Sequence, residues 1–227
     1  MTNTFAGAPA PTAAKSTKSL TGVYRWLRGA LIVYAVAYAL AGLGSLWFAA
    51  SIPEGYDVQV DMLPAEWLQA AGGLIGIPVY WLCIVLFCVF TFRAMRNLHL
   101  WGAPSADMAP GWAVGWYFIP VANLFKPLEG MTQIRDGARE IASQPPVEDT
   151  RLGLWWTGWI AGTILNRVAF RVGGGWQANA DVSMQSISAA LSAVACALLV
   201  GAVLAILPVL REITANQERH SLAQAFG

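Results

Sequence analysis

The sequence GWAVGWYFIPVANLFKP, which occupies residues 111–127, decides how the rest of the chain is arranged. It is as apolar as a membrane-spanning segment, but Pro120 and Asn123 interrupt it. An unbroken α-helix over residues 109–125 would be about 25 Å long, which is shorter than the roughly 30 Å hydrocarbon core of a bilayer. Proline also removes one backbone donor and clashes with the preceding turn of a helix. We therefore predict that this segment breaks in a re-entrant or interfacial position and returns to the side from which it came.

The composition of the whole chain is typical of a protein that lies in lipid. Hydrophobic residues make up 56% of the chain and charged residues only 12%, and the mean hydropathy is +0.51. This balance predicts an all-α fold, a polytopic membrane helical bundle that forms a single domain over residues 20–210. Residues 1–19 are predicted to be a disordered cytoplasmic tail, because they are rich in Ala, Thr, Pro and Ser and lack an apolar period. Residues 211–227 are predicted to be a short, polar cytoplasmic tail.

Four apolar stretches predict spanning helices, at residues 31–48, 72–92, 152–170 and 187–207. Between the broken segment and the third of these spans, apolar residues recur at steps of three or four from Leu128 to Ile141. That spacing is typical of an amphipathic helix. We expect this helix on the cytoplasmic side, either on the bilayer surface or packed under the bundle.

The distribution of Lys and Arg predicts the orientation. If residues 109–125 do not cross the membrane, twelve of the 14 Lys and Arg side chains lie on one side, and only Arg167 and Arg171 lie on the other. If the segment does cross, the division is eight against six. Cytoplasmic loops carry the excess of Lys and Arg, so the first arrangement is favoured and both termini are expected in the cytoplasm.

Small residues at four-residue intervals predict close helix packing in two of the spans, because they let another backbone approach. The first span carries such a seam in Ala37, Ala41, Ser45 and Ala49. The last span has a longer series, whose neighbour is either a helix of the same chain or a second copy. Its members are Ala189, Ala193, Ala197, Gly201 and Ala205.

The broken segment also carries a family resemblance. The run PGWAVGWYFIPVANLFKP at residues 110–127, followed by LWW at residues 154–156, resembles the signature of a bacterial membrane-protein family, domain of unknown function 4328. The same order of segments extends from about residue 25 to residue 219. The resemblance implies a bacterial multi-pass protein, which we expect in the plasma (inner) membrane, and it implies no activity. The candidate motif residues are Trp112, Trp116, Pro120, Asn123, Lys126 and Pro127.

The residues argue against catalysis. The four predicted spans contain no Asp, Glu or His, so a general base is lacking there. Cys83, Cys88 and Cys196 lie inside apolar runs without metal-ligand spacing. We therefore expect no enzymatic activity, no metal site and no cofactor. We also expect no nucleic-acid partner, because the chain has no basic face.

The sequence favours a scaffold, regulatory or partner-binding membrane module, in contact with the lipid bilayer and with a second copy or another membrane protein. The alternative is a component of a transporter or channel for ions or small solutes, which the broken segment favours. The predicted working site lies between Pro120 and Pro127, with Asn123 and Lys126 as its polar groups. Pro120 removes the helical donor of the Trp116 carbonyl, and Asn123 could replace it. In the structural alternative, Asn123 caps the break and Lys126 reaches lipid headgroups.

Overall fold

The computed structural model describes residues 17–52, 63–175 and 181–226, and within these ranges the regular structure is helical, without a strand. The all-α prediction is therefore confirmed. The long helices are α1 (Thr21–Ser51), α2 (Pro64–Trp101), α5 (Arg151–Val172) and α6 (Val182–Phe226). The shorter elements are α3 (Pro110–Gly115), α4 (Lys126–Ile141) and the two 3₁₀ turns between them, η1 (Trp116–Phe118) and η2 (Ala122–Leu124).

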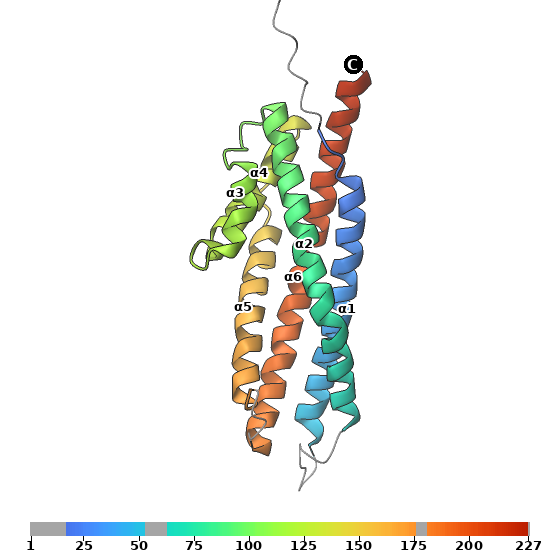
Figure 1. The fold of residues 1–227 in the computed structure, drawn as a ribbon, viewed down its shortest axis with the longest axis vertical. Helices are drawn as coiled ribbons and strands as arrows, with labels where there is room; N and C mark the ends of the chain where they lie inside the picture. The colour runs from blue at the N-terminus through green and yellow to red at the C-terminus, as the bar shows by residue number, and fades with distance from the viewer. Residues whose placement is uncertain (1–16, 53–62, 176–180, 227) are drawn as a thin grey trace, which may run out of the picture.

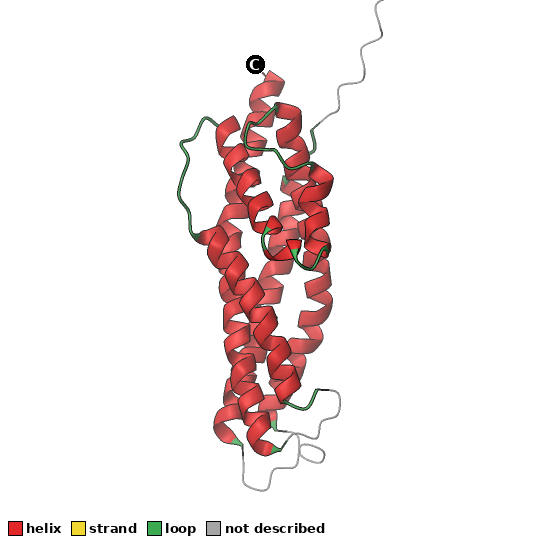
Figure 2. Cartoon of the chain, turned by 90° about the vertical axis from the view of Figure 1, so that its left-hand side faces the viewer, coloured by secondary structure: helices red, strands yellow, loops and turns green. Residues whose placement is uncertain are grey.

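The four long helices lie side by side in a bundle (Figure 1). α1 packs between α2 and α6, and α6 packs between α1 and α5, whereas α2 and α5 share no extended contact. α1 begins and α6 finishes at the same end of the bundle, which we call the terminal end. α3 and α4 lie beside the terminal half, where they contact α2 and α6 (Figures 1 and 2).

Of the described helices, α1, α2 and α6 are long and apolar enough to cross a membrane. The chain therefore has the helices of a membrane protein, and three of the four predicted spans are supported. α5 holds the remaining predicted span and packs along α6, but it does not belong to the three. Its tryptophans and Arg167 make it less apolar than the other long helices.

α6 continues beyond the last predicted span, through Pro208 to Phe226. A proline inside a helix costs about 3 kcal/mol. Val209, Leu210 and Ile213 are completely buried at the terminal end. Each such burial contributes roughly 1.5–3 kcal/mol, so together they outweigh the proline and extend the helix.

Glycine sets the distance between α1 and α2. A Cβ atom added to Gly72 would lie 2.6 Å from the carbonyl oxygen of Ala37 and 2.8 Å from the Cβ of Ala41. Real Cβ atoms do not approach backbone so closely, so only glycine fits here. The predicted small-residue seam of the first span is therefore a packed helix interface.

The longer series in α6 does not pack in this way within the chain. Of its five members only Ala189 is buried, Ala197 and Gly201 are exposed, and nothing lies within 4 Å of the Cβ position of Gly201. The face that packs on α5 is a neighbouring one, where a Cβ on Gly162 would meet the Ala195 carbonyl oxygen at 3.1 Å. At Ala197 and Gly201 the ladder faces outward in the described chain, because the glycines of α5 pack on a different face of α6, and its packing on a second copy stays a prediction.

A buried polar network holds the start of the described chain at the terminal end. The Asn97 side chain accepts a hydrogen bond from the Lys18 N–H (3.0 Å) and donates to the Lys18 carbonyl (2.8 Å). It also donates to Gln217 Oε1 (3.1 Å), and Gln217 donates to the carbonyl of Ala94 (3.1 Å). Asn97 and Gln217 are both almost fully buried. The last residues of the predicted N-terminal tail are therefore fixed against α2 and α6.

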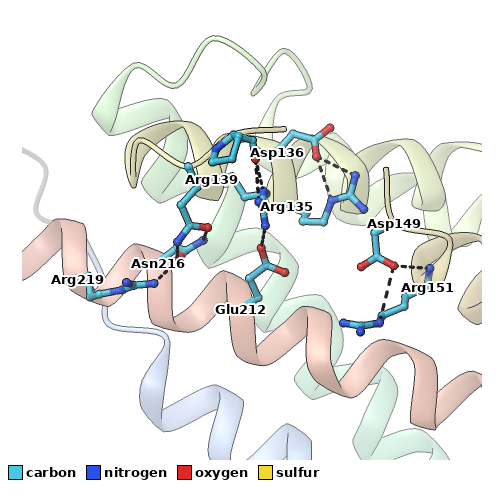
Figure 3. Close-up of polar contacts among 10 residues, drawn as sticks. Arg135, Asp136, Arg139, Asp149, Arg151, Glu212, Asn216 and Arg219 are labelled. Atoms are coloured by element: carbon cyan, nitrogen blue, oxygen red, sulfur yellow. Dashed lines mark hydrogen bonds and ion pairs between the residues drawn. The ribbon is translucent and has the colours of Figure 1, made fainter. Parts of the chain in front are cut away.

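α4 is the predicted amphipathic helix. Its apolar face buries Met131, Ile134 and Ala138 completely, and its contacts are with α2 and α6. Its charged face reaches α6 through an ion pair between Arg139 and Glu212 (Figure 3). α4 is therefore packed on the bundle.

Candidate functional site

The elements α3, η1, η2 and α4 form a hairpin, because the residues before α3 contact the middle and the end of α4. Ser105, which precedes α3, donates from its backbone N–H to Glu140 near the end of α4 (3.1 Å). The Met108 N–H likewise donates to Gln133 Oε1 (2.9 Å). α3 has only six residues, so it is about 9 Å long and far too short to cross a bilayer. The segment therefore reverses direction beside the bundle.

The sequence explains the reversal. A residue that precedes proline is disfavoured in the helical region, and Ile119 before Pro120 is extended, with φ −100° and ψ 113°. The helix therefore stops after η1, and the chain turns at Pro120. Pro127 stands in the first turn of α4, where its missing N–H has no helical partner to lose. The two prolines of the candidate motif thus mark the turn and the restart.

One predicted contact at the break is corrected. We expected Asn123 to donate to the Trp116 carbonyl, but the N–H of Ile119 donates to it instead, at 3.4 Å. The chain tightens into a 3₁₀ turn at this point, and such a turn bonds residues three apart. The backbone N–H of Asn123 donates to the Ile119 carbonyl (2.7 Å), so the Asn123 side chain is not used in closing the turn.

The other motif residues lie on the outside of the hairpin. The rings of Trp112 and Trp116 stack with centroids 4.7 Å apart. Lys126 forms an ion pair with Glu129 (2.7 Å), and both side chains are partly exposed. Asn123 instead lines a cavity that Lys126 does not reach. The structure therefore separates the two polar residues that the sequence placed in one site.

This cavity, of about 280 Å³, lies between the hairpin, α2, α5 and α6. We call it the hairpin cavity. Among the residues that the structure describes, its lining contains aromatic, aliphatic, cysteine and asparagine side chains and no Asp, Glu, His, Lys or Arg. Its aromatic and polar lining residues include Tyr80, Phe87, Tyr117, Asn123, Trp155 and Trp159.

Two pairs of aromatic rings join α2 and α5 in the wall of the cavity. Tyr80 stacks on Trp159 with ring centroids 5.7 Å apart and planes 9° apart. Phe87 stacks on Trp155 at 5.4 Å and 24°. Trp155 and Trp159 are four residues apart, as neighbours on one helical face are, and Tyr80 and Phe87 are seven apart. That spacing is the sequence signal from which these residues could have been identified as a site.

A tryptophan of α5 also holds the hairpin. Trp156 donates a hydrogen bond from its indole N–H to the Leu124 carbonyl in η2, at 2.9 Å. The Trp156 side chain is almost fully buried. This bond gives a partner to a carbonyl at the chain reversal, which has none within a helix.

Two residues that line the hairpin cavity each carry a buried polar atom without a hydrogen-bond partner among the described residues. These atoms are the hydroxyl oxygen of Tyr117 and the Oδ1 atom of Asn123. Thr91 lies near the Tyr117 hydroxyl, but no hydrogen bond of acceptable geometry joins the two. An unpaired buried polar group costs about 1–3 kcal/mol, so each atom lowers the stability of the empty protein.

The cavity opens sideways. Trp81 and Phe118 line it, and yet 62% and 68% of their respective surfaces are exposed to the outside of the bundle. Two helices that share no extended contact, α2 and α5, flank this opening. In a bilayer, the opening therefore faces lipid.

The fold and the cavity together define a class: a helical membrane protein whose bundle carries a broken hairpin over an aromatic pocket. Within that class, the chain belongs to the family described as Domain of unknown function (DUF4328), whose family model matches residues 59–215. The match covers the described parts of α2, the hairpin, α5 and most of α6, so every element that lines the cavity except α1 lies within it. No curated protein and no solved structure matched the chain.

Proposed function

We propose that this protein is a membrane module of the bacterial plasma membrane that binds a ligand or partner and acts as a scaffold or regulator, without catalysis or transport. One observation carries the proposal: the hairpin cavity has uncharged walls, and its unpaired polar atoms gather on the hairpin. Binding pockets are mostly apolar and place a few polar groups to orient a ligand. Base catalysis needs a titratable group near its working pH, and transport of ions needs ionisable or polar groups along a path.

We further propose four spans with both termini in the cytoplasm, α5 being the fourth. α5 packs along α6, and the hairpin lies at the terminal end of the bundle (Figure 1). With this end in the cytoplasm, Arg and Lys are concentrated on the cytoplasmic side, as in most membrane proteins.

Polar contacts between the hairpin and α6 support a regulatory role. Arg139 pairs with Glu212, and the amides of Gln144 and Asn216 exchange two hydrogen bonds of 3.1 and 3.2 Å. A ligand that moved the hairpin would therefore also move the C-terminal part of α6. Figure 3 shows these contacts along one side of that helix.

Transport is the second candidate, because broken helices often surround the substrate sites of transporters. Purified protein in sealed liposomes would separate the two candidates. We expect the fluxes of protons, Na⁺, K⁺ and glycerol to equal those of protein-free liposomes. A flux above that background which Cys88→Phe abolishes, by filling the cavity, would overturn the proposal in favour of transport.

The topology has its own test, which uses exposed positions before and after the hairpin. In a background without the three native cysteines, Asp107→Cys and Glu148→Cys should both resist an impermeant maleimide applied to intact cells. Both should react after the membrane is permeabilised. Labelling of Glu148→Cys alone from outside would mean that the segment between them crosses.

A further inference from the structure

We infer that the hairpin cavity is a binding site for an uncharged lipid alcohol, a long-chain molecule with a hydroxyl head, which enters from the bilayer between α2 and α5. This inference rests on the proposed binding function and names the ligand class for the same site. It follows from the opening of the cavity, the chemistry of its two unpaired atoms, the absence of charge in its walls and its volume.

The opening selects a ligand that is already in the membrane. Trp81 and Phe118 belong to both the cavity wall and the lipid-facing surface. A molecule can therefore pass from the bilayer into the cavity without crossing water. The hydrocarbon part of such a molecule would lie against the aromatic rings of Phe87 and Trp155, which favour apolar contact.

The two unpaired atoms select a hydroxyl head. Asn123 Oδ1 can only accept a hydrogen bond, whereas the Tyr117 hydroxyl can donate one. A single alcohol group has the chemistry that both atoms need, because it can donate to Asn123 and accept from Tyr117. It also fits if the amide is turned, since a hydroxyl can accept from the amide nitrogen. Binding would thus satisfy both atoms that are buried without partners in the empty cavity.

The walls exclude a charged head. A carboxylate or phosphate buried here would meet neither Lys, Arg nor His among the described lining residues. Burial of an unpaired ion costs far more than burial of a neutral hydroxyl. Fatty acids and phospholipid headgroups should therefore bind worse than the corresponding alcohol.

The volume shows how much of the ligand is enclosed. An apolar cavity of about 150 Å³ accepts benzene, so 280 Å³ holds a head and the first part of one chain. The rest of the chain would extend through the opening into the bilayer. The head would lie at the hairpin, with Tyr117 and Asn123, and the chain would leave past Trp81 and Phe118.

Brominated probes can test the inference, because bromine quenches tryptophan fluorescence on contact and four tryptophans line the cavity. The full-length protein in liposomes would be titrated with a dibrominated octadecanol, the matching dibrominated octadecane and the matching octadecanoate. We expect the alcohol to quench at a mole fraction about tenfold lower than either of the others, as one or two net hydrogen bonds would give. Unbrominated octadecanol should reverse the quenching.

Two variants locate the binding. Tyr117→Phe/Asn123→Ala should bind the alcohol no better than the alkane, and Tyr24→Phe, whose ring lies on α1 away from the cavity, should keep the preference. Tyr117→Phe alone should weaken alcohol binding and yet raise the melting temperature of the ligand-free protein, because it removes an unpaired buried hydroxyl. A purely structural Tyr117 would not show this opposite pair of effects.

Several outcomes would overturn the inference. Equal quenching by alcohol and alkane would show that the cavity contacts lipid chains without recognising a hydroxyl group. Tighter binding of the octadecanoate would contradict a preference for a neutral head. A preference that persists in the double variant would place the hydroxyl elsewhere. If the double variant does not fold, two results still test the inference. One is the comparison of the three brominated probes on the wild-type protein, and the other is Cys88→Phe, which should lose quenching by the alcohol. None of these results changes the outcome of the flux measurement. The proposed ligand and the proposed function can therefore be contradicted independently of each other.

Discussion

Glu218, near the end of the chain, accepts a hydrogen bond from the backbone N–H of Leu20, 2.7 Å away, at the start of the first helix. The same carboxylate oxygen accepts from the Ser19 hydroxyl (2.6 Å) and the Thr21 N–H (3.1 Å). The first N–H groups of a helix have no partner inside it, and a neighbouring side chain usually supplies one. In α1 the residue at the N-cap is Leu20, which cannot, so α6 caps α1 from a distance.

The first prediction concerns this cap. Glu218→Ala should lower the free energy of unfolding by about 1 kcal/mol, the usual effect of losing an N-cap. Chemical denaturation in detergent would measure the loss. Glu148→Ala, which removes an exposed carboxylate in the connector before α5, is the matched control and should have little effect. Equal losses in the two variants would show that Glu218 does not act as a cap.

The cap should also depend on pH. Burial opposes ionisation of Glu218, but the hydrogen bonds from Ser19, Thr21 and Leu20 outweigh it, so its pKa is lowered. A carboxyl whose pKa is lower in the folded state stabilises the fold above its unfolded pKa, which is about 4.3. That contribution is lost as the pH falls through the folded pKa. The difference in stability between wild type and Glu218→Ala should therefore be constant near neutral pH and shrink in acid.

A second prediction compares two glycines in spanning helices. Gly72→Ala should destabilise the protein by roughly 1–3 kcal/mol, because the new methyl group would clash with the backbone of α1 at Ala37. Gly201→Ala should be neutral or slightly stabilising, since its Cβ meets nothing and alanine favours a helix. Thermal unfolding in detergent would measure both.

Gly73→Ala provides the control for Gly72, because it adds the same methyl group one residue along, where nothing lies within 4 Å. If Gly201→Leu destabilises the protein only at concentrations where it self-associates, the α6 ladder packs against a second copy. If Gly201→Leu destabilises the monomer, the outward position of this residue is wrong.

The sequence predicted the parts of this fold that follow from local pattern. Apolar length gave α1, α2 and α6, the spacing of Leu128 to Ile141 gave α4, and Pro120 gave the chain reversal. These features depend on the backbone and on a single helical face. The resemblance to the DUF4328 family rested on the same broken segment and is confirmed.

What the sequence could not predict depends on contacts between distant residues. Four-residue spacing gave the same expectation for Ala37 and Gly201, and only the neighbouring helix distinguishes them, because Ala37 packs on Gly72 and nothing lies near Gly201. Burial of Ile213 against other helices extends α6 beyond Pro208. Rules based on local sequence do not include the free energy of that burial. In the candidate site, Asn123 lies at the break, but the cavity that it lines also depends on the tryptophans of α5, for which the sequence predicted no contact.

A third prediction concerns the link between α4 and α6. Arg139 pairs with Glu212 and also donates two hydrogen bonds to the Pro145 carbonyl, at 3.0 and 2.7 Å (Figure 3). Arg139→Ala should therefore cost more stability than Glu212→Ala, because it removes both contacts. A double-mutant cycle should give a coupling energy of roughly 0.5–3 kcal/mol. Arg139→Lys should restore only part of the loss, since an ammonium group cannot match the planar fork of a guanidinium. A coupling energy of zero would mean that the ion pair does not hold α4 in place.

The last prediction compares two adjacent tryptophans at the hairpin. Both Trp155 and Trp156 are almost fully buried, but only Trp156 donates to the Leu124 carbonyl. Replacing either with phenylalanine removes a similar apolar area, so the lost hydrogen bond distinguishes the variants. Trp156→Phe should leave the Leu124 carbonyl unpaired and lower the free energy of unfolding by about 1–3 kcal/mol more than Trp155→Phe does.

The loss should be local, because the bond joins η2 to α5 and no other element. Hydrogen exchange should therefore accelerate at the amides of Asn123 and Phe125 in Trp156→Phe, while those of α1 stay unchanged. Equal acceleration in Trp155→Phe would show that the aromatic packing, and not the indole hydrogen bond, holds the hairpin against the bundle.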